Sequence, residues 1–106
     1  MKLNFLERMM LVGLLPQSGN ILTLKSLRVL REELSPSPEE YAELEIKEDA
    51  ATGQMFWNPE QGSVEKEFDV PTSLFKIVAD KLRDLEKDEE LIENQVSLYH
   101  KFITGD

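Results

Sequence analysis

The chain contains no cysteine and only one histidine, His100. Without cysteine it can form neither a disulfide nor a thiolate metal site, so nothing indicates an oxidising compartment. A single histidine with only carboxylates around it is a poor match for the ligand sets that hold zinc. We therefore expect no metal and no other cofactor.

Long apolar runs are missing as well. A membrane-spanning helix needs about 20 consecutive apolar residues, and no window of the sequence approaches that length. The apolar stretch at residues 9–15 follows Glu7 and Arg8, ends at Pro16 and is not followed by a small-residue cleavage motif. This pattern argues against a cleaved signal peptide. We expect an intracellular protein that does not cross a membrane.

The common catalytic motifs are also absent. The sequence has no Gly-x-Ser-x-Gly turn, no Gly-x-x-x-x-Gly-Lys loop and no Gly-x-Gly-x-x-Gly fingerprint. Glu45 and Lys47 have the spacing of a pair found in metal-dependent nucleases, but those sites need an acidic ligand upstream, and no aspartate precedes Asp49. We assign no catalytic residue and predict that the chain is not an enzyme.

Acidic residues are plentiful, and their distribution is uneven. The 106 residues carry a net charge of −9. Residues 1–34 hold five basic and three acidic side chains, so the remaining residues carry a formal charge of −11. An acidic surface repels phosphate backbones and attracts basic surfaces. A protein partner with a basic surface is therefore favoured over nucleic acid.

Two helices are predicted in the N-terminal third. Residues 3–15 are apolar nearly all round, which is typical of a core helix, with Leu3, Leu6, Met10 and Leu14 on one face. Residues 23–34 carry a leucine stripe at helical spacing, and Thr23 is the expected N-cap.

The segment LLPQSGNILTL joins these helices and raises the alternative of a helix-turn-helix module. In that alternative the DNA-contacting residues would be Lys25, Arg28 and Arg31. The connection is longer than the usual turn of three to four residues, and the chain as a whole is acidic. We therefore interpret the segment as the turn of a helical hairpin that builds core.

In the middle third of the chain, the spacing of apolar residues changes from a helical period to alternation. Ser37, Pro38 and Glu40 form a capping-box signal, which predicts a short helix ending near Leu44, with Tyr41 anchored in the core. Residues 43–49 and 64–70 then alternate apolar and charged side chains, as half-buried strands do. The aromatic segment 54–58 lies between them, so an antiparallel meander of two to three strands is the economical arrangement. Its inner face would carry Leu44, Ile46, Val64 and Phe68, joined by either Phe56 or the pair Met55 and Trp57.

Two further helices complete the prediction. One begins at Pro71 and Thr72, and the other has Asp88 as its expected N-cap, runs to about Thr104 and ends at Gly105. The residues expected to be buried on the final helix are Ile92, Val96, Tyr99 and Ile103. The predicted fold is a single α+β domain spanning residues 1–106, in which a helical hairpin, a short helix and the meander are followed by two helices packed on the sheet.

The two alternating strands suggest a site. Their charged positions face away from the apolar ones, and if the strands share a sheet the carboxylates crowd one face. These residues are Glu43, Glu45, Asp49, Glu65, Glu67 and Asp69. The face is either a solvated surface that prevents edge-to-edge aggregation or a binding surface for a basic protein. In the second case the outward-facing aromatic, Trp57 or Phe56, is the expected hot spot.

Four short runs carry a resemblance. They are L-N-F-L-E-R (3–8), G-L-L-P-x-x-G-N (13–20), T-L-K-x-x-R-x-L-R-E-E-L-S (23–35) and S-L-Y-H-K-F (97–102). Their order resembles small proteins of unknown activity that bacteriophages and prophages encode, which implies a place in the cytoplasm of a bacterial host. The first expectation in that setting is a protein that binds and modulates another protein, for example a nucleic-acid-handling factor. A virion structural or assembly component and a DNA-binding regulator are the alternatives, and we expect a monomer or a small homo-oligomer.

Overall fold

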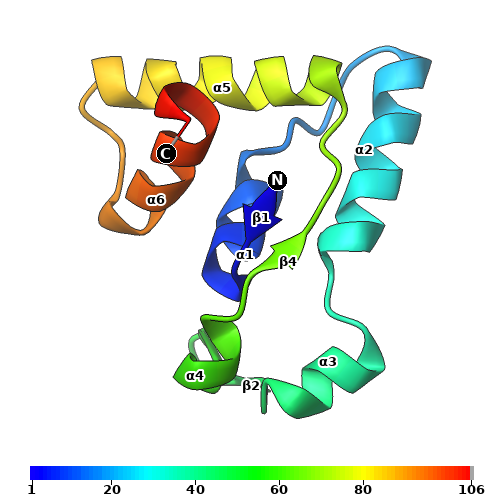
Figure 1. Ribbon diagram of the computed structural model, residues 1–106, viewed down its shortest axis with the longest axis vertical. Helices are drawn as coiled ribbons and strands as arrows, with labels where there is room; N and C mark the ends of the chain where they lie inside the picture. The colour runs from blue at the N-terminus through cyan, green and yellow to red at the C-terminus, as the bar shows by residue number, and fades with distance from the viewer. Residues whose placement is uncertain (106) are drawn as a thin grey trace.

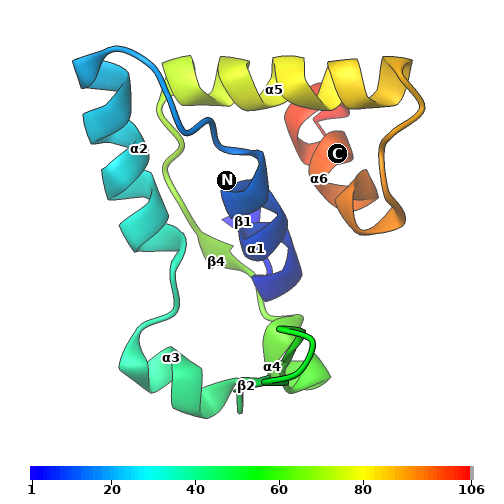
Figure 2. The same ribbon diagram turned by 180° about the vertical axis from the view of Figure 1, so that it is seen from behind.

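Helices make up most of the structure, a computed structural model in which residues 1–105 are described. The elements in chain order are β1 (Lys2–Leu3), α1 (Phe5–Leu14), α2 (Ile21–Leu34), α3 (Pro38–Glu43), β2 (Lys47–Glu48), β3 (Met55–Phe56), α4 (Pro59–Gly62), β4 (Lys66–Glu67), α5 (Thr72–Lys87), η1 (Glu93–Gln95), α6 (Val96–Tyr99) and the π-helical turn η2 (His100–Thr104). In Figures 1 and 2, α5 crosses one end of the molecule and α2 runs along one side. The short elements α3, β2 and α4 lie at the opposite end from α5.

The first helix begins later than its apolar pattern suggests. Leu3 belongs to β1, and Asn4 is the N-cap of α1, because its side chain accepts a hydrogen bond from the Glu7 backbone at 2.9 Å. The predicted face was partly wrong, since Leu6 is only half-buried whereas Glu7 and Arg8 are buried. Charged residues can occupy a buried face when ion pairs compensate them, and periodicity alone does not reveal this.

The second helix also has a different N-cap from the one expected. Asn20 caps α2 by accepting a hydrogen bond from the Thr23 backbone at 2.9 Å, so Thr23 lies inside the helix. The prediction that Thr23 is the cap was wrong, because Asn is an equally good capping residue and precedes it. Leu27, Leu30 and Leu34 are buried as their spacing indicates.

The strands do not form one sheet. β2 pairs with β3, with Lys47 opposite Phe56, whereas β4 pairs with the N-terminal strand β1, with Leu3 opposite Lys66. The predicted meander of two to three strands was therefore correct for the antiparallel pairing of its first two segments, and the placing of segment 64–70 in the same sheet was wrong. Asn58 and Pro59 begin the short helix α4, which separates β3 from β4 in the chain, where a hairpin loop was expected. A capping Asn followed by Pro at the first helical position is a helix-start signal as much as a turn signal.

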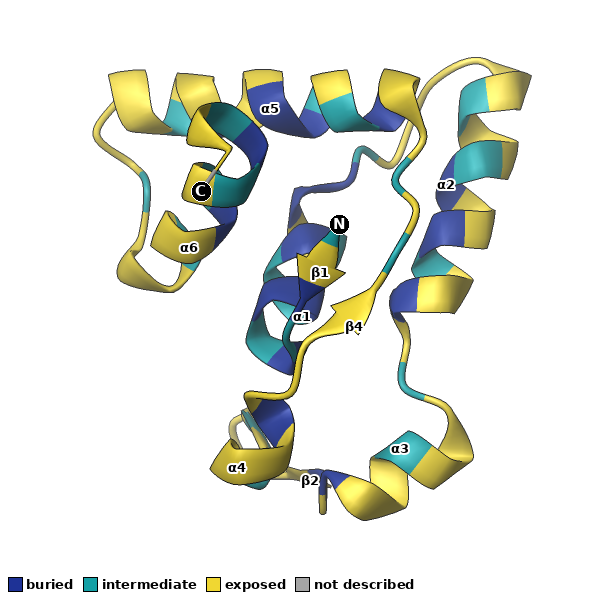
Figure 3. Ribbon diagram, in the orientation of Figure 1, coloured by how far each residue is buried: buried dark blue, intermediate teal, exposed yellow. Residues whose placement is uncertain are grey.

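The main core lies where α1, α2, α5 and the C-terminal elements meet. The dark blue inner sides of these helices face one another in Figure 3. Its fully buried members come from every one of these segments and include Leu11, Leu27, Leu74, Leu82 and Leu98. A second, smaller cluster holds Phe5, Leu44 and Ile46, with the partly buried Met9, Met55 and Trp57 packed against it.

In the C-terminal region the structure confirms helix α5 and the end of the final helical segment, but that segment begins later than the expected N-cap at Asp88 and buries a different row of residues. Helix α5 is present, and Gly105 ends the last helical turn with a φ of 79°. Leu98 and Phe102 are buried, while Ile92 and Val96 are 51% and 41% exposed. Tyr99 and Ile103 are half-buried against the core, so the predicted buried face was only partly correct. Residues 88–92 are not helical, and the ring of Phe102 stacks on that of Phe75 at 4.6 Å.

Within residues 1–105, none of the helices is both long enough and apolar enough to cross a membrane.

Candidate functional site

A large group of carboxylates without counter-ions lies in residues 38–62, which we call the acidic lobe. This lobe contains α3, the β2–β3 hairpin and α4, and it forms the end of the molecule opposite α5 (Figure 1). It holds seven acidic residues and one lysine, Lys47, and so has a formal charge of −6. More than half of the net charge of −9 is therefore located in this part of the chain.

Local capping interactions build the lobe. Ser37 accepts a hydrogen bond from the Glu40 backbone at 3.1 Å and completes the predicted capping box of α3. Asn58 caps α4 through the Glu60 backbone at 2.9 Å, and its amide donates to Glu45 Oε2 at 3.0 Å. Asn58 thus joins the end of α3 to the start of α4.

Trp57 fastens the lobe to α1. Its ring meets that of Phe5 edge to face, with the centroids 4.9 Å apart at 72°. On another side it contacts Gly62, where an added Cβ would lie 2.5 Å from Trp57 Cδ1. Trp57 is half-buried, whereas Phe56 is 51% exposed. The aromatic that faces outward is therefore Phe56.

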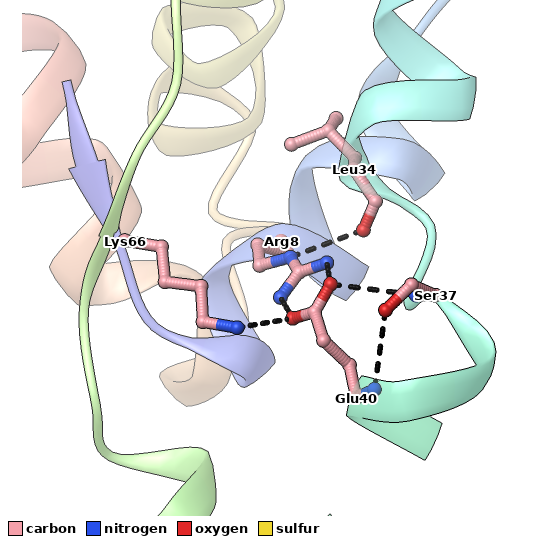
Figure 4. Close-up of polar contacts among 5 residues, drawn as sticks. All are labelled: Arg8, Leu34, Ser37, Glu40 and Lys66. Atoms are coloured by element: carbon pink, nitrogen blue, oxygen red, sulfur yellow. Dashed lines mark hydrogen bonds and ion pairs between the residues drawn. The ribbon is translucent and has the colours of Figure 1, made fainter.

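An ion cluster makes the second attachment (Figure 4). Arg8 Nη1 donates to Glu40 Oε2 at 2.7 Å, and Arg8 Nε donates to the Leu34 carbonyl at 3.0 Å. Lys66 of β4 donates to the same Glu40 oxygen at 2.8 Å. The guanidinium also lies over the ring of Phe68, 5.0 Å from its centroid. One buried arginine therefore links α1, the end of α2 and α3.

The cluster changes the acidity of Glu40. The hydrogen bond from Arg8, opposed by partial burial and supported by Lys66 and the Ser37 backbone, lowers the pKa of Glu40 from 4.5 to about 2. Glu40 is thus ionised throughout the physiological range and serves the structure. A small cavity of about 80 Å³ lies beside it, and pockets for organic ligands are several times larger.

The remaining carboxylates of the lobe have no counter-ion. No ion pair among the described residues includes them. They are Glu39, Glu43, Glu45, Glu48, Asp49 and Glu60, and all of them are exposed. Their mutual repulsion is not relieved within the residues 1–105, so an approaching cation is attracted to this end of the molecule.

An apolar depression opens among these charges. It has a volume of about 340 Å³ and is lined by Met55, Phe56, Trp57 and Pro59. Glu48 is the cross-strand neighbour of Met55, and Glu60 follows Pro59 directly. The depression thus combines an apolar floor with carboxylates close to its edge, which is a common arrangement in protein interfaces.

The structure divides the carboxylates that the sequence grouped on one sheet face. Glu43, Glu45 and Asp49 lie in the acidic lobe at the end of α3 and around the β2–β3 hairpin. Glu67 lies in β4 of the other sheet, Glu65 directly precedes that strand, and Asp69 lies beside α2. The expectation of a single carboxylate face was wrong, because strands 43–49 and 64–70 do not pair with each other.

Two of these residues are engaged in structural contacts. Lys101 donates to the Glu65 carboxylate, to buried Glu7 at 2.8 Å and to the Lys2 carbonyl at 2.8 Å. Hydrogen bonding to Lys101 lowers the pKa of Glu65. Desolvation opposes ionisation of Lys101, but its bonds to Glu65 and Glu7 outweigh this and raise the pKa of the ammonium group. Glu67 pairs with the N-terminal amine at 3.0 Å.

Sequence reasoning did not single out Glu48 and Glu60, two exposed carboxylates beside the depression. Glu48 falls between the alternating positions of its segment, and Glu60 lies in what resembled a loop. The signal that could have identified both is the high density of acidic residues in segment 38–62, whatever their periodicity.

The three basic residues of the DNA-binding alternative do not form one exposed cationic group. Arg31 donates to the Pro16 carbonyl at 2.8 Å and so fixes the loop before α2. Arg28 is 84% exposed and lies 3.6 Å from Glu32, a pair worth only a few tenths of a kcal/mol. Lys25 lines a groove beside α2. This arrangement leaves few cations free to contact phosphates.

In the described part of the chain there is no group of three or more His, Cys, Asp or Glu side chains that could hold a metal ion. Comparison with protein-family models, with curated proteins and with solved structures found no significant match to this chain.

Proposed function

We propose that this protein is a binding module whose acidic lobe docks a basic segment of another protein. The observation that carries the proposal is the apolar depression of Met55, Phe56, Trp57 and Pro59 set among carboxylates without counter-ions. Lysine and arginine side chains of the partner pair with the carboxylates, and an apolar side chain between them enters the depression. Protein surfaces that bind nucleic acid are rich in lysine and arginine, as the partner's segment would be. A nucleic-acid-handling protein is therefore a suitable partner.

The rigidity of the lobe supports this proposal. Phe56 follows Met55 in β3 and precedes Trp57, which is held between Phe5 and Gly62. The exposed ring is therefore presented by fixed backbone, and little conformational entropy is lost when a partner covers it. Aromatic side chains that a partner buries and shields from water are common binding hot spots.

The test uses two synthetic peptides of equal positive charge, one rich in lysine and leucine and the other in lysine and serine. Fluorescence of Trp57, the only tryptophan, reports binding because this residue lines the depression. We expect the leucine-containing peptide to bind more tightly. The change Phe56→Ser should weaken its binding by about tenfold and leave the serine-containing peptide unaffected.

Variants that remove charge test the carboxylates around the depression. The triple variant Glu45→Gln, Glu48→Gln and Glu60→Gln should weaken binding about tenfold, since each lost pair contributes about 0.5 kcal/mol. The change Lys47→Gln should strengthen binding about twofold, because it removes the one cation of the lobe.

The matched control removes the same charge elsewhere. Asp84→Asn, Glu86→Gln and Glu90→Gln alter exposed residues in and just after α5, at the far end of the molecule. We expect less than a twofold effect from this control. Equal losses in the two triple variants would show that only net charge matters, and the docking proposal would then be wrong.

A further inference from the structure

Helix α2 carries large apolar side chains that remain exposed rather than packed within the chain. Leu22 is 73% exposed, Ile21 65% and Val29 55%. Leu22 and Val29 are separated by two helical turns and lie on the same side of α2. Figures 1 and 2 show the segment that leads into α5 running beside α2, and Val29 lies on the flank of α2 that faces this segment.

A groove follows that side of the helix. It has a volume of about 370 Å³, and its walls include Lys25, Val29 and Glu33 of α2 together with Asp69 and Pro71 of the segment before α5. Lys25, Val29 and Glu33 recur at intervals of four residues, so they form one row along the helix. The row therefore has a cation at one end, an apolar residue in the middle and a carboxylate at the other end, and Asp69 adds a second carboxylate on the facing wall of the groove.

The charges of this row are complementary to themselves. Lys25 and Glu33 are placed symmetrically about Val29, and neither takes part in an ion pair with another of the residues 1–105. A two-fold axis through Val29 would place a second α2 antiparallel to the first. Lys25 of each copy would then face Glu33 of the other, with the two Val29 side chains between them. A parallel arrangement would instead bring like charges together.

We propose that the chain forms a two-fold symmetric homodimer through antiparallel packing of α2, centred on Val29. Such an interface is isologous, so each residue pair occurs twice and every favourable or unfavourable contact is doubled. Leu22 would lie at each edge of the interface, opposite the C-terminal end of the other copy's α2. The proposal concerns a different surface from the acidic lobe and does not depend on the docking of a basic segment there.

Exchanging the charges at Lys25 and Glu33 tests the proposal. Sedimentation equilibrium of the full chain over a range of concentrations measures the dimer dissociation constant of each variant. We expect the wild type to form dimers and the single variants Lys25→Glu and Glu33→Lys each to raise the dimer dissociation constant at least about tenfold, because each creates two like-charge contacts. The double variant with both changes should recover the wild-type constant. An equimolar mixture of the two single variants should form dimers, since every contact between the different chains then joins opposite charges.

Circular dichroism of each variant checks that the exposed substitutions leave the fold intact. A control on the neighbouring row, Arg28→Gln with Glu32→Gln, removes an exposed pair outside the groove and should leave dimerisation unchanged. The proposal is overturned if the wild type remains monomeric at every concentration, or if the mixture of single variants stays monomeric. A monomer that binds duplex DNA, with binding lost in Lys25→Glu, would overturn it in favour of a nucleic-acid surface.

Discussion

Glu40 offers the sharpest test of how the acidic lobe is attached. The change Glu40→Gln keeps the capping box, since glutamine serves there as well as glutamate, but it removes the charge that faces Arg8 and Lys66. The pKa of Glu40 falls from 4.5 to about 2 on folding. At about 1.4 kcal/mol for each pKa unit, ionised Glu40 stabilises the fold by about 3 kcal/mol at neutral pH.

The pH dependence follows from the direction of this shift. A carboxyl whose pKa is lowered by folding stabilises the native state above its unfolded pKa, and the contribution disappears as the pH falls through the folded pKa. The difference in unfolding free energy between wild type and Glu40→Gln should be constant above about pH 5 and should shrink between pH 4.5 and about 2. Urea denaturation followed by Trp57 fluorescence measures it, because Trp57 packs against Phe5 at the junction.

The control is Glu39→Gln, which changes an exposed carboxylate in the same first turn of α3. Only its interaction with the helix dipole is lost, so we expect a cost below about 1 kcal/mol. If Glu40→Gln cost no more than this control, or if its cost were independent of pH down to about 2, the assignment of Glu40 to a structural ion cluster would be refuted.

Two further substitutions test other parts of the structure. Gly62→Ala should destabilise the protein by about 1 to 3 kcal/mol and shift the emission of Trp57, because the added methyl group would meet the indole ring. An unchanged spectrum would contradict the described contact. Lys101→Met should cost about 3 kcal/mol in urea denaturation, since Glu7, which is 1% exposed, loses its counter-ion. The exposed Lys76→Met should cost less than about 0.5 kcal/mol, and equal costs would contradict a structural role for Lys101.

The sequence predicts the helices well where caps and leucine spacing agree. Ser37 and Glu40 locate α3, and the leucine stripe locates most of α2. The final helix shows the limit of this reasoning, because two apolar rows are available there. Contact of Phe102 with Phe75 selects one row, and such a contact between distant segments leaves no local signal.

The pairing of the strands could not be predicted from the alternation of apolar and charged residues. Residues 64–70 alternate, but their partner is the segment that starts the chain, where Met1 exchanges backbone hydrogen bonds with Phe68. Two-residue strands contribute few ladder bonds, so their pairing depends on the packing of the helices around them. The location of the candidate site could not be predicted for the same reason. Its acidic character was visible in the sequence, whereas its location depended on a pairing that periodicity does not determine.

The ion pairs separate two kinds of carboxylate that a net charge of −9 does not distinguish. Glu7, Glu40 and Glu65 have lysine or arginine partners that join segments distant in the chain, so their charges are already compensated. Reversing Glu65 to lysine would therefore disturb the junction with Lys101 as well as the surface. The carboxylates around Phe56 lack such partners, and substitutions there change the surface potential at little structural cost. A binding test should for this reason be confined to the carboxylates of the acidic lobe that have no counter-ion, which excludes Glu40, so that loss of affinity is not confused with loss of the fold.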